Sequence, residues 1–346
     1  MSHRTAPKLD ATSIPSAAPQ TPTAFVPAWW CRNAHLQTLW PPLFRRRPRV
    51  ALRRERLELA DGDFLDLDWA VRDVAASESS APIVLVLHGL EGSSESKYAL
   101  GVINASAARG WRGVILNFRG CSGEPNRLPH SYHSGETADL AYVIGLLKAR
   151  EPQARLAVVG YSLGGNAMLK WLGEAQAHAH IDAAVAVSPP FVLADCAWRM
   201  ERGFSRLYQW SLVHRLKRSI EAKQRRMTMP IELTGLAHLQ TFREFDDRVT
   251  APLNGFDGVD DYYTRSSSRQ FLRHITVPTL ILHSRDDPFM TEAAIPQRDE
   301  LSAAIEFELQ ARGGHVGFVA GDVPWRAHYW LEQRIPEFLA QHLARG

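Results

Sequence analysis

Residues 158–169, VVGYSLGGNAML, place a serine between glycines at the end of an apolar run. A serine hydroxyl becomes a nucleophile when a neighbouring base accepts its proton. Residues 160–164 match the G-x-S-x-G turn between a strand and a helix, in which Gly160 and Gly164 leave room for the sharp bend that exposes Ser162. Ser162 could instead cap the helix. The strand-like residues before it and the helical pattern after it favour a catalytic serine.

A catalytic serine requires a histidine base and a carboxylate that orients the base, and in this kind of turn the acid and then the histidine follow in the chain. Of the 14 histidines, His315, His328 and His342 come after the candidate acids. His315 lies in the glycine-flanked segment ARGGHVGF after the last expected strand, whereas the other two fall within a C-terminal helical pattern at 323–343. We therefore predict that His315 is the base.

Two adjacent carboxylates, Asp286 and Asp287, follow the apolar run LILHS. The turn at residues 284–287 is similar to the G-x-x-D turn of many α/β-hydrolases, whose last residue is the acid. Asp287 is therefore the predicted acid and Asp286 the alternative. An aspartate in such a turn can also bind local backbone N–H groups, and that structural role is open to Asp286.

The oxyanion of a tetrahedral intermediate calls for two backbone N–H donors. We predict that the amide of Leu163, next to the nucleophile, is one donor. The loop HGLEG at residues 88–92 follows an earlier apolar run, and the amide of Leu90 is the second predicted donor. His88 is expected to support this loop by hydrogen bonding, because it precedes the serine in the chain.

The surrounding elements alternate between strand and helix patterns. RLELADGDFLDLDWAV alternates apolar and polar residues around Asp61-Gly62 and predicts a β-hairpin. PIVLVLHG, GVILNF, RLAVVG, AAVAVS, TVPTLILHS and IEFEL are typical of strands, with helical spacing between most of them. This order predicts an α/β fold with a mostly parallel eight-stranded sheet and helices on both faces.

The alternation is interrupted after Pro189-Pro190. We expect a disordered tail at 1–23, a core formed by 24–190 and 271–346, and a helical lid inserted at 191–270. Between Arg199 and Arg226 the lid carries nine Lys or Arg against two Glu. An apolar underside would suit an acyl chain and the basic face an anionic membrane surface, although such a charge run is often only a solvated face. The expected underside consists of Phe204, Leu207, Tyr208, Trp210, Leu212, Val213 and Leu216.

Composition excludes several classes of protein. The chain has 346 residues, 45% of them apolar, with 40 basic against 37 acidic side chains, so we expect a large core and no nucleic-acid partner. Three cysteines are too few for a disulfide framework, and no apolar leader or spanning segment is visible; we expect a cytoplasmic protein, with peripheral membrane contact through the lid as the alternative. His130 and His133 lack partners at metal-ligand spacing, and no metal site is predicted.

These segments together resemble the YheT-like α/β-hydrolases, a branch of the AB hydrolase superfamily grouped with medium-chain ester synthase/esterases. The resemblance covers roughly residues 25–340 and is carried by AHLQTLWP (34–41), NFRGCSG (117–123), YHSGETADL (132–140), GYSLGGNAMLKWLGE (160–174), TFREFDD (241–247) and DPFM (287–290). It implies the triad Ser162, Asp287 and His315, no cofactor, and a carboxylic ester hydrolase acting on short- to medium-chain esters, with monoacylglycerol as a candidate substrate.

Two other functions remain open on the sequence alone. The same triad serves acyltransferases and thioesterases, so the fold does not settle the acceptor or the substrate. A hydrolase fold without catalysis that binds lipid through its basic lid is the second alternative. The complete set of triad residues favours the enzyme.

Overall fold

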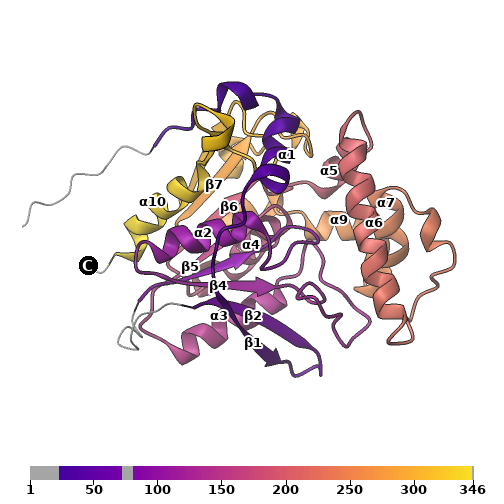
Figure 1. Ribbon diagram of the computed structural model, residues 1–346. Coiled ribbons are helices and arrows are strands. Elements are labelled where there is room, and N and C mark those ends of the chain that lie inside the picture. The colour runs from indigo at the N-terminus through magenta and orange to yellow at the C-terminus, as the bar shows by residue number, and fades with distance from the viewer. Residues whose placement is uncertain (1–22, 72–80, 345–346) are drawn as a thin grey trace, which may run out of the picture.

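An eight-stranded sheet forms the centre of the computed structural model, which describes residues 23–71 and 81–344 (Figure 1). The strand order is β1-β2-β4-β3-β5-β6-β7-β8. From β4 to β8 every neighbouring pair is parallel, whereas β1 and β2 add an antiparallel edge. The strands are β1 (Leu52–Glu58), β2 (Phe64–Ala70), β3 (Ile83–Leu87), β4 (Arg112–Asn117), β5 (Leu156–Tyr161), β6 (Ala183–Val187), β7 (Thr279–Ser284) and β8 (Ile305–Gln310).

The predicted hairpin is confirmed: β1 and β2 are antiparallel, and Glu58 pairs with Phe64 at the turn. Gly62 has a φ of +85°, which a glycine adopts without steric strain. The eight-stranded, mostly parallel sheet expected from the sequence is therefore present.

Helices cover both faces of the sheet. On one face, α2 (Lys97–Ala107) and α10 (Leu331–Leu343) pack on one set of strand side chains. On the other face, α3 (Ala138–Arg150) and α4 (Leu163–Ala175) pack on the alternate set. Because β3, β5 and β6 are buried on both faces, their sequences are continuous apolar runs rather than alternating ones.

The C-terminal segment differs from the expected helix over 323–343. Helix α10 begins only at Leu331. Before it, β10 (His328–Tyr329) pairs with β9 (Val319–Ala320) in a small antiparallel ribbon, so the backbone is extended at 328–329. His328 is therefore a strand residue, whereas His342 lies in the helix as expected. The expected tail at 1–23 lies outside the described residues except for Thr23, whose hydroxyl donates to Glu337 at 2.8 Å.

The segment between β6 and β7 is helical and forms a separate group of helices at the right of Figure 1. It contains two apolar clusters of its own in addition to its contacts with the core. Its first two helices are separated near Gly203, which has a φ of +56°. We call residues 191–270 the inserted segment; its helices are α5 (Leu193–Met200), α6 (Ser205–Gln224), α7 (Phe242–Phe245), α8 (Ala251–Leu253) and α9 (Val259–Ser266).

Helix α6 does not separate apolar and basic residues as the sequence suggested. Tyr208 and Val213 are buried, but Phe204, Leu207 and Trp210 are exposed although they were expected on the underside. The seven residues expected on the underside are distributed around the whole circumference of the helix at about 100° per residue, so together they cannot form one apolar stripe. None of the helices in the described part of the chain is long and apolar enough to cross a membrane.

Helix α1 (Ala34–Phe44) precedes the sheet in the chain and packs close to β9 and α2. Its N-cap residue Asn33 accepts hydrogen bonds from the amides of His35 and Leu36.

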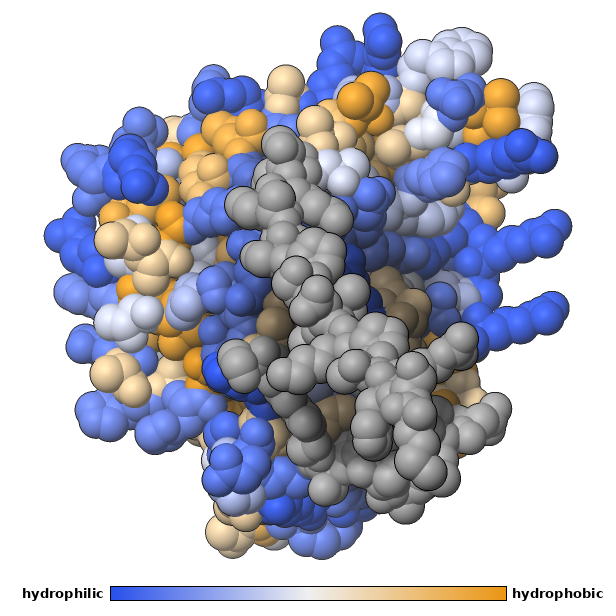
Figure 2. Space-filling model, turned by 90° about the vertical axis from the view of Figure 1, so that its left-hand side faces the viewer, coloured by the Kyte–Doolittle hydropathy of each residue, from blue (hydrophilic) through white to orange (hydrophobic). Residues whose placement is uncertain are grey.

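The side of the molecule at the left of Figure 1 shows mainly hydrophilic side chains with scattered apolar ones where it is not covered in the view (Figure 2).

Candidate active site

Ser162 lies in the sharp turn between β5 and α4. Its φ of +50° and ψ of −118° are strained for a residue other than glycine, as expected of a nucleophile turn. The neighbouring glycines are sterically required. A Cβ on Gly160 would lie 2.6 Å from the carbonyl oxygen of Gly164, and a Cβ on Gly164 would lie 2.6 Å from that of His88. Each substitution would push backbone apart in the turn.

The structure brings the three predicted triad side chains together. Nε2 of His315 lies 2.9 Å from Oγ of Ser162, and Nδ1 of His315 lies 2.8 Å from Oδ2 of Asp287. With the proton on Nδ1 donated to the carboxylate, Nε2 is free to accept the serine proton. Burial raises the pKa of Asp287, but the charge of His315 and its hydrogen bond outweigh this and hold the pKa below its usual value. The carboxylate thus stays ionised beside the imidazole.

Asp286 has a different set of contacts. Its Oδ1 accepts a hydrogen bond from the amide of Gly314 at 3.0 Å, so it holds the backbone next to the imidazole. Burial raises its pKa. Of the two adjacent carboxylates, Asp287 is therefore the one bonded to the ring of His315.

The loop that carries His315 is held by α1, a contact that sequence reasoning did not foresee. Oγ1 of Thr38 accepts from the amide of His315 at 2.9 Å. The buried Gln37 accepts from the amide of Val319 at 2.6 Å and donates to its carbonyl at 3.0 Å. A Cβ on Gly317 would lie 2.3 Å from the carbonyl oxygen of Gln37, so only glycine allows this close approach. The only sequence feature that pointed to Gln37 and Thr38 was the family-like segment AHLQTLWP (34–41), which contains both of them.

The predicted oxyanion loop lies beside the nucleophile. A Cβ on Gly89 would lie 3.3 Å from Cβ of Ser162. In the described part of the chain, the amides of Leu90 and Leu163 have no hydrogen-bond acceptor, so both are available to a ligand. The two predicted donors therefore meet this requirement of an oxyanion hole.

His88 supports this loop through both ring nitrogens. Nδ1 donates to the carbonyl of Gly89 at 2.8 Å, and Nε2 accepts from the amide of Phe118 at 3.1 Å. Burial lowers the pKa of His88 to about 4, so the ring is neutral and can play both roles.

Two cavities meet at Ser162. The outer cavity, about 540 Å³, opens between α1, the oxyanion loop and α6, and is lined by Thr38, Leu39, Pro42, Tyr98, Tyr208 and Leu212 among others. The inner cavity, about 100 Å³, lies between the sheet edge and the inserted segment, and is lined by Leu163, Leu193, Ala197, Leu216, Phe242 and Tyr262 among others. Both are also lined by His315 and Phe289. Phe289 was not singled out as a site residue from the sequence, although it lies in the segment DPFM.

Asp246 is a second site residue that sequence reasoning missed, although it lies in TFREFDD. It lines the inner cavity and accepts hydrogen bonds from Thr250 Oγ1 at 2.6 Å and from the hydroxyl of Tyr263 at 2.9 Å. Burial raises its pKa to about 6. A π-helix begins at this residue, Asp246–Thr250, and such bulges are frequent at functional sites.

The other histidines and cysteines considered as reactive groups lack an arrangement suited to metal binding or nucleophilic attack. Among the described residues, no cluster of three or more His, Cys, Asp or Glu side chains is arranged as metal ligands would be. His133 packs edge-on against Phe256 and Tyr262 instead. Burial raises the pKa of the Cys121 thiol, which makes it a poor nucleophile.

Comparison with known proteins gives consistent matches. Residues 82–322 match the family model described as alpha/beta hydrolase fold. The protein named "Putative esterase YheT" of Escherichia coli (strain K12) is 44% identical over 321 residues, covering 92% of this chain and 94% of its own. Phospholipase ABHD3 of Mus musculus is 31% identical over 333 residues, covering 95% and 81% respectively. The crystal structure of the Pyrococcus furiosus esterase Pf2001 shares the fold with a TM-score of 0.55 at 16% identity, covering 85% and 92%.

Proposed function

Because the chain belongs to the alpha/beta hydrolase family and is a carboxylic ester hydrolase, we propose that Ser162, His315 and Asp287 are its nucleophile, base and acid. The observation that carries this assignment is the unbroken chain of two hydrogen bonds, 2.9 Å and 2.8 Å, from hydroxyl to imidazole to carboxylate. We also propose that residues 24–190 and 271–346 form the catalytic core, and that the inserted segment is its lid.

The reaction follows from this geometry. Oγ of Ser162 attacks the ester carbonyl carbon while its proton passes to Nε2 of His315. The amides of Leu90 and Leu163 stabilise the oxyanion. The imidazolium then gives its proton to the departing alcohol, which leaves an acyl-enzyme. Water, deprotonated by the same imidazole, attacks the acyl carbon, and collapse of the second intermediate releases the carboxylic acid and restores the serine.

The proposed substrates are short- to medium-chain carboxylic esters, including monoacylglycerol-type lipids. The inner cavity is small and largely apolar, and the side chains of Leu193, Ala197 and Phe242 supply its apolar wall. Each methylene that fits there contributes about 0.8 kcal/mol through burial. The larger outer cavity opens toward solvent and suits the alcohol part of the ester. The phospholipase name of a mammalian relative favours an acyl ester of glycerol.

Turnover of p-nitrophenyl butyrate by the wild type and Ser162→Ala tests the proposal. The variant should lose turnover by at least about 10³-fold, because it lacks the hydroxyl that is proposed to form the acyl-enzyme. Ser106→Ala is a matched control, because this buried hydroxyl in α2 has no hydrogen-bond partner in the described part of the chain. Ser162→Ala enzyme that keeps wild-type turnover would contradict the assignment.

Initial rates on p-nitrophenyl esters from acetate to laurate, with monoacylglycerol and acyl-CoA beside them, test the substrate class. Rates should peak at short to medium chains and exceed those on acyl-CoA of equal length. A maximum at laurate would contradict the proposed chain length, and faster acyl-CoA turnover would favour a thioesterase.

We propose a cytoplasmic protein that touches membranes through the inserted segment. Its exposed apolar side chains Leu207 and Trp210 lie on α6 together with several arginines, and the exposed Phe204 directly precedes this helix, a composition that suits an anionic lipid surface. Trp198 on α5 is also exposed, with the guanidinium of Arg202 over its ring at 3.3 Å.

Flotation with vesicles tests this contact. Wild-type protein should float with phosphatidylserine-containing vesicles more than with phosphatidylcholine vesicles, and Leu207→Ser/Trp210→Ser should reduce flotation. Trp325→Ser is the matched control, because Trp325 is 81% exposed but lies outside the inserted segment. Equal flotation of all three proteins would contradict the proposal.

A further inference from the structure

Glu91 occupies an unusual position in the oxyanion loop. It directly follows Leu90, the proposed oxyanion donor, and its φ is +53°. A non-glycine residue in this left-handed region is strained, so surrounding contacts must hold it there. The conformation of Glu91 also sets the direction of the preceding peptide groups. Whatever holds Glu91 therefore helps to aim the Leu90 amide.

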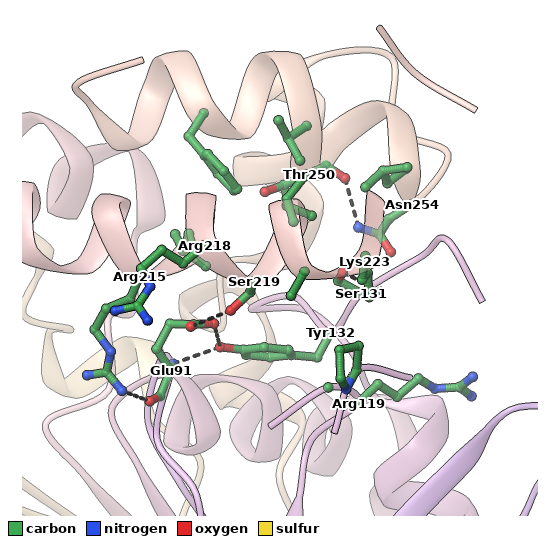
Figure 3. A pocket seen from close by; sticks show the side chains of 18 of the residues that line it. Glu91, Arg119, Ser131, Tyr132, Arg215, Arg218, Ser219, Lys223, Thr250 and Asn254 are labelled. Carbon is green, nitrogen blue, oxygen red and sulfur yellow. Dashed lines mark hydrogen bonds between the residues drawn. The ribbon is translucent and has the colours of Figure 1, made fainter. Parts of the chain in front are cut away.

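Tyr132 holds Glu91 from the side of the core (Figure 3). Its hydroxyl accepts a hydrogen bond from the amide of Glu91 at 2.7 Å and donates one to Oε1 of the same residue at 3.0 Å. The Tyr132 ring is buried and stacks on Phe118 with centroids 5.3 Å apart. This anchor is therefore rigid and belongs to the same part of the chain that carries the sheet.

Helix α6 holds Glu91 from the side of the inserted segment. Ser219 donates to Oε2 of Glu91 at 2.8 Å, and the guanidinium of Arg215 donates to the Glu91 carbonyl (Figure 3). Ser219 and Glu91 are 128 residues apart in the chain. These contacts lie at the wall of a separate cavity of about 360 Å³ between α6 and the loop that carries Tyr132. The carboxylate of Glu91 thus connects the loop of Tyr132 with α6 through hydrogen bonds alone.

We propose that Glu91 is a positioning residue that aims the Leu90 amide at the oxyanion and makes this aim depend on the seating of α6. The inference rests on the proposed function and deepens it, because it makes the inserted segment part of the catalytic apparatus. When α6 moves away, the loop loses the bonds from Ser219 and Arg215. Glu91 then keeps only Tyr132 against its backbone strain, and the Leu90 amide turns away from the substrate.

Glu91→Ala tests the positioning role directly, because it removes the carboxylate and keeps the backbone strain. On p-nitrophenyl butyrate, kcat should fall by roughly 10-fold to 100-fold with KM within about 2-fold, since a donor to the oxyanion acts mainly in the transition state. The affinity for an alkyl trifluoromethyl ketone, which forms a tetrahedral oxyanion on a serine, should fall by a similar factor. Glu91→Gln should recover part of both, because its amide can still bond Tyr132 and Ser219.

Ser219→Ala isolates the contribution of α6 and removes only one hydroxyl from a half-buried helix position. It should lower kcat and ketone affinity in the same direction by a smaller factor. Gln224→Ala, an exposed substitution at the end of α6, is the matched control and should change neither. Thermal melting of each variant identifies any loss of folded protein.

Three outcomes decide the inference. Unchanged kcat in folded Glu91→Ala would overturn it, and so would a lower kcat with unchanged ketone affinity, since that pattern does not involve the oxyanion. Unchanged values in Ser219→Ala would overturn the link to α6. Each of these results leaves the loss of turnover in Ser162→Ala untouched, so failure of this inference is distinguishable from failure of the proposed function.

Discussion

The ring of Phe289 stacks face to face on the imidazole of His315, with centroids 4.0 Å apart and an angle of 6° between the planes. The ring nitrogens of an imidazole form hydrogen bonds at the ring edge, so a ring stacked on its face restricts tilting without blocking the bonds to Asp287 and Ser162. The amide of Phe289 donates to Oδ1 of Asp287 at 2.8 Å. One residue therefore orients two members of the proposed triad.

Phe289→Leu should lower kcat about 3-fold to 10-fold, because stacking of this kind is worth about 0.5–1.5 kcal/mol. The backbone bond to Asp287 persists in the variant, so the loss reports on the ring alone. Steady-state kinetics on p-nitrophenyl butyrate measure it. Phe256→Leu is the control, because Phe256 packs on His133 rather than on the triad. Equal losses in both variants would contradict a specific role of Phe289.

Asp287→Asn should reduce kcat by about 10³-fold to 10⁴-fold, because an amide no longer holds the imidazole in the productive tautomer. Asp286→Asn should have a much smaller effect, since Asp286 bonds the backbone of Gly314 and not the ring. The two kcat values, measured side by side, check this asymmetry. A larger loss in Asp286→Asn would show that the acid has been assigned to the wrong residue.

Thr38→Val should lower kcat while leaving the triad residues intact, because it removes the oxygen that accepts from the His315 amide. A buried amide left without a partner costs about 1–3 kcal/mol, so both stability and positioning of the loop should suffer. Urea unfolding and kcat measured on the same variant separate the two effects. Thr38→Ser, which keeps the hydroxyl, should restore both, and a failure to restore them would contradict this explanation.

Asp246 predicts a pH dependence of stability. Its pKa is raised from 3.8 to about 6 by burial. As the pH rises from roughly 4 to 6, the unfolded chain releases this proton while the native protein keeps it, so native stability falls, by on the order of 3 kcal/mol from this group. The deficit is complete above pH 6 and absent below pH 4.

Asp246→Asn removes this titration. Its free energy of unfolding, relative to that of the wild type, should therefore increase between pH 4 and pH 7. Urea denaturation at several pH values measures the difference. Asp260→Asn is the control, because Asp260 is a fully exposed carboxylate of the same inserted segment. A constant difference between Asp246→Asn and wild type across this range would contradict a buried, proton-binding Asp246.

The sequence was sufficient for the sheet and for the residues that meet at its edge. Continuous apolar runs mark β3, β5 and β6 because parallel strands are buried on both faces. The glycines around Ser162 and the order of acid and histidine placed the candidate triad, since each follows a strand end. Such features are local in the chain, and local patterns can be read from one sequence.

Contacts between segments far apart in the chain could not be predicted from local sequence patterns. Nothing in the local pattern of Thr38 or Glu91 indicates that they hold the loops of His315 and Leu90, because these contacts depend on tertiary packing. The prediction of a helix at His328 was wrong for a related reason: the pairing of this segment with β9 overrides its helical pattern. The outward position of Leu207 and Trp210 likewise depends on which face of α6 the core leaves free.

Covalent labelling with a fluorophosphonate, followed by mass analysis of the peptides, is the sharpest test of Ser162 as the nucleophile, because the probe reacts preferentially with a serine that a neighbouring base activates. We expect one adduct, on the peptide that contains Ser162, and almost none in His315→Ala, which keeps the serine but lacks the base. An adduct on another residue, or labelling of Ser162 that persists at the wild-type rate in His315→Ala, would contradict this assignment.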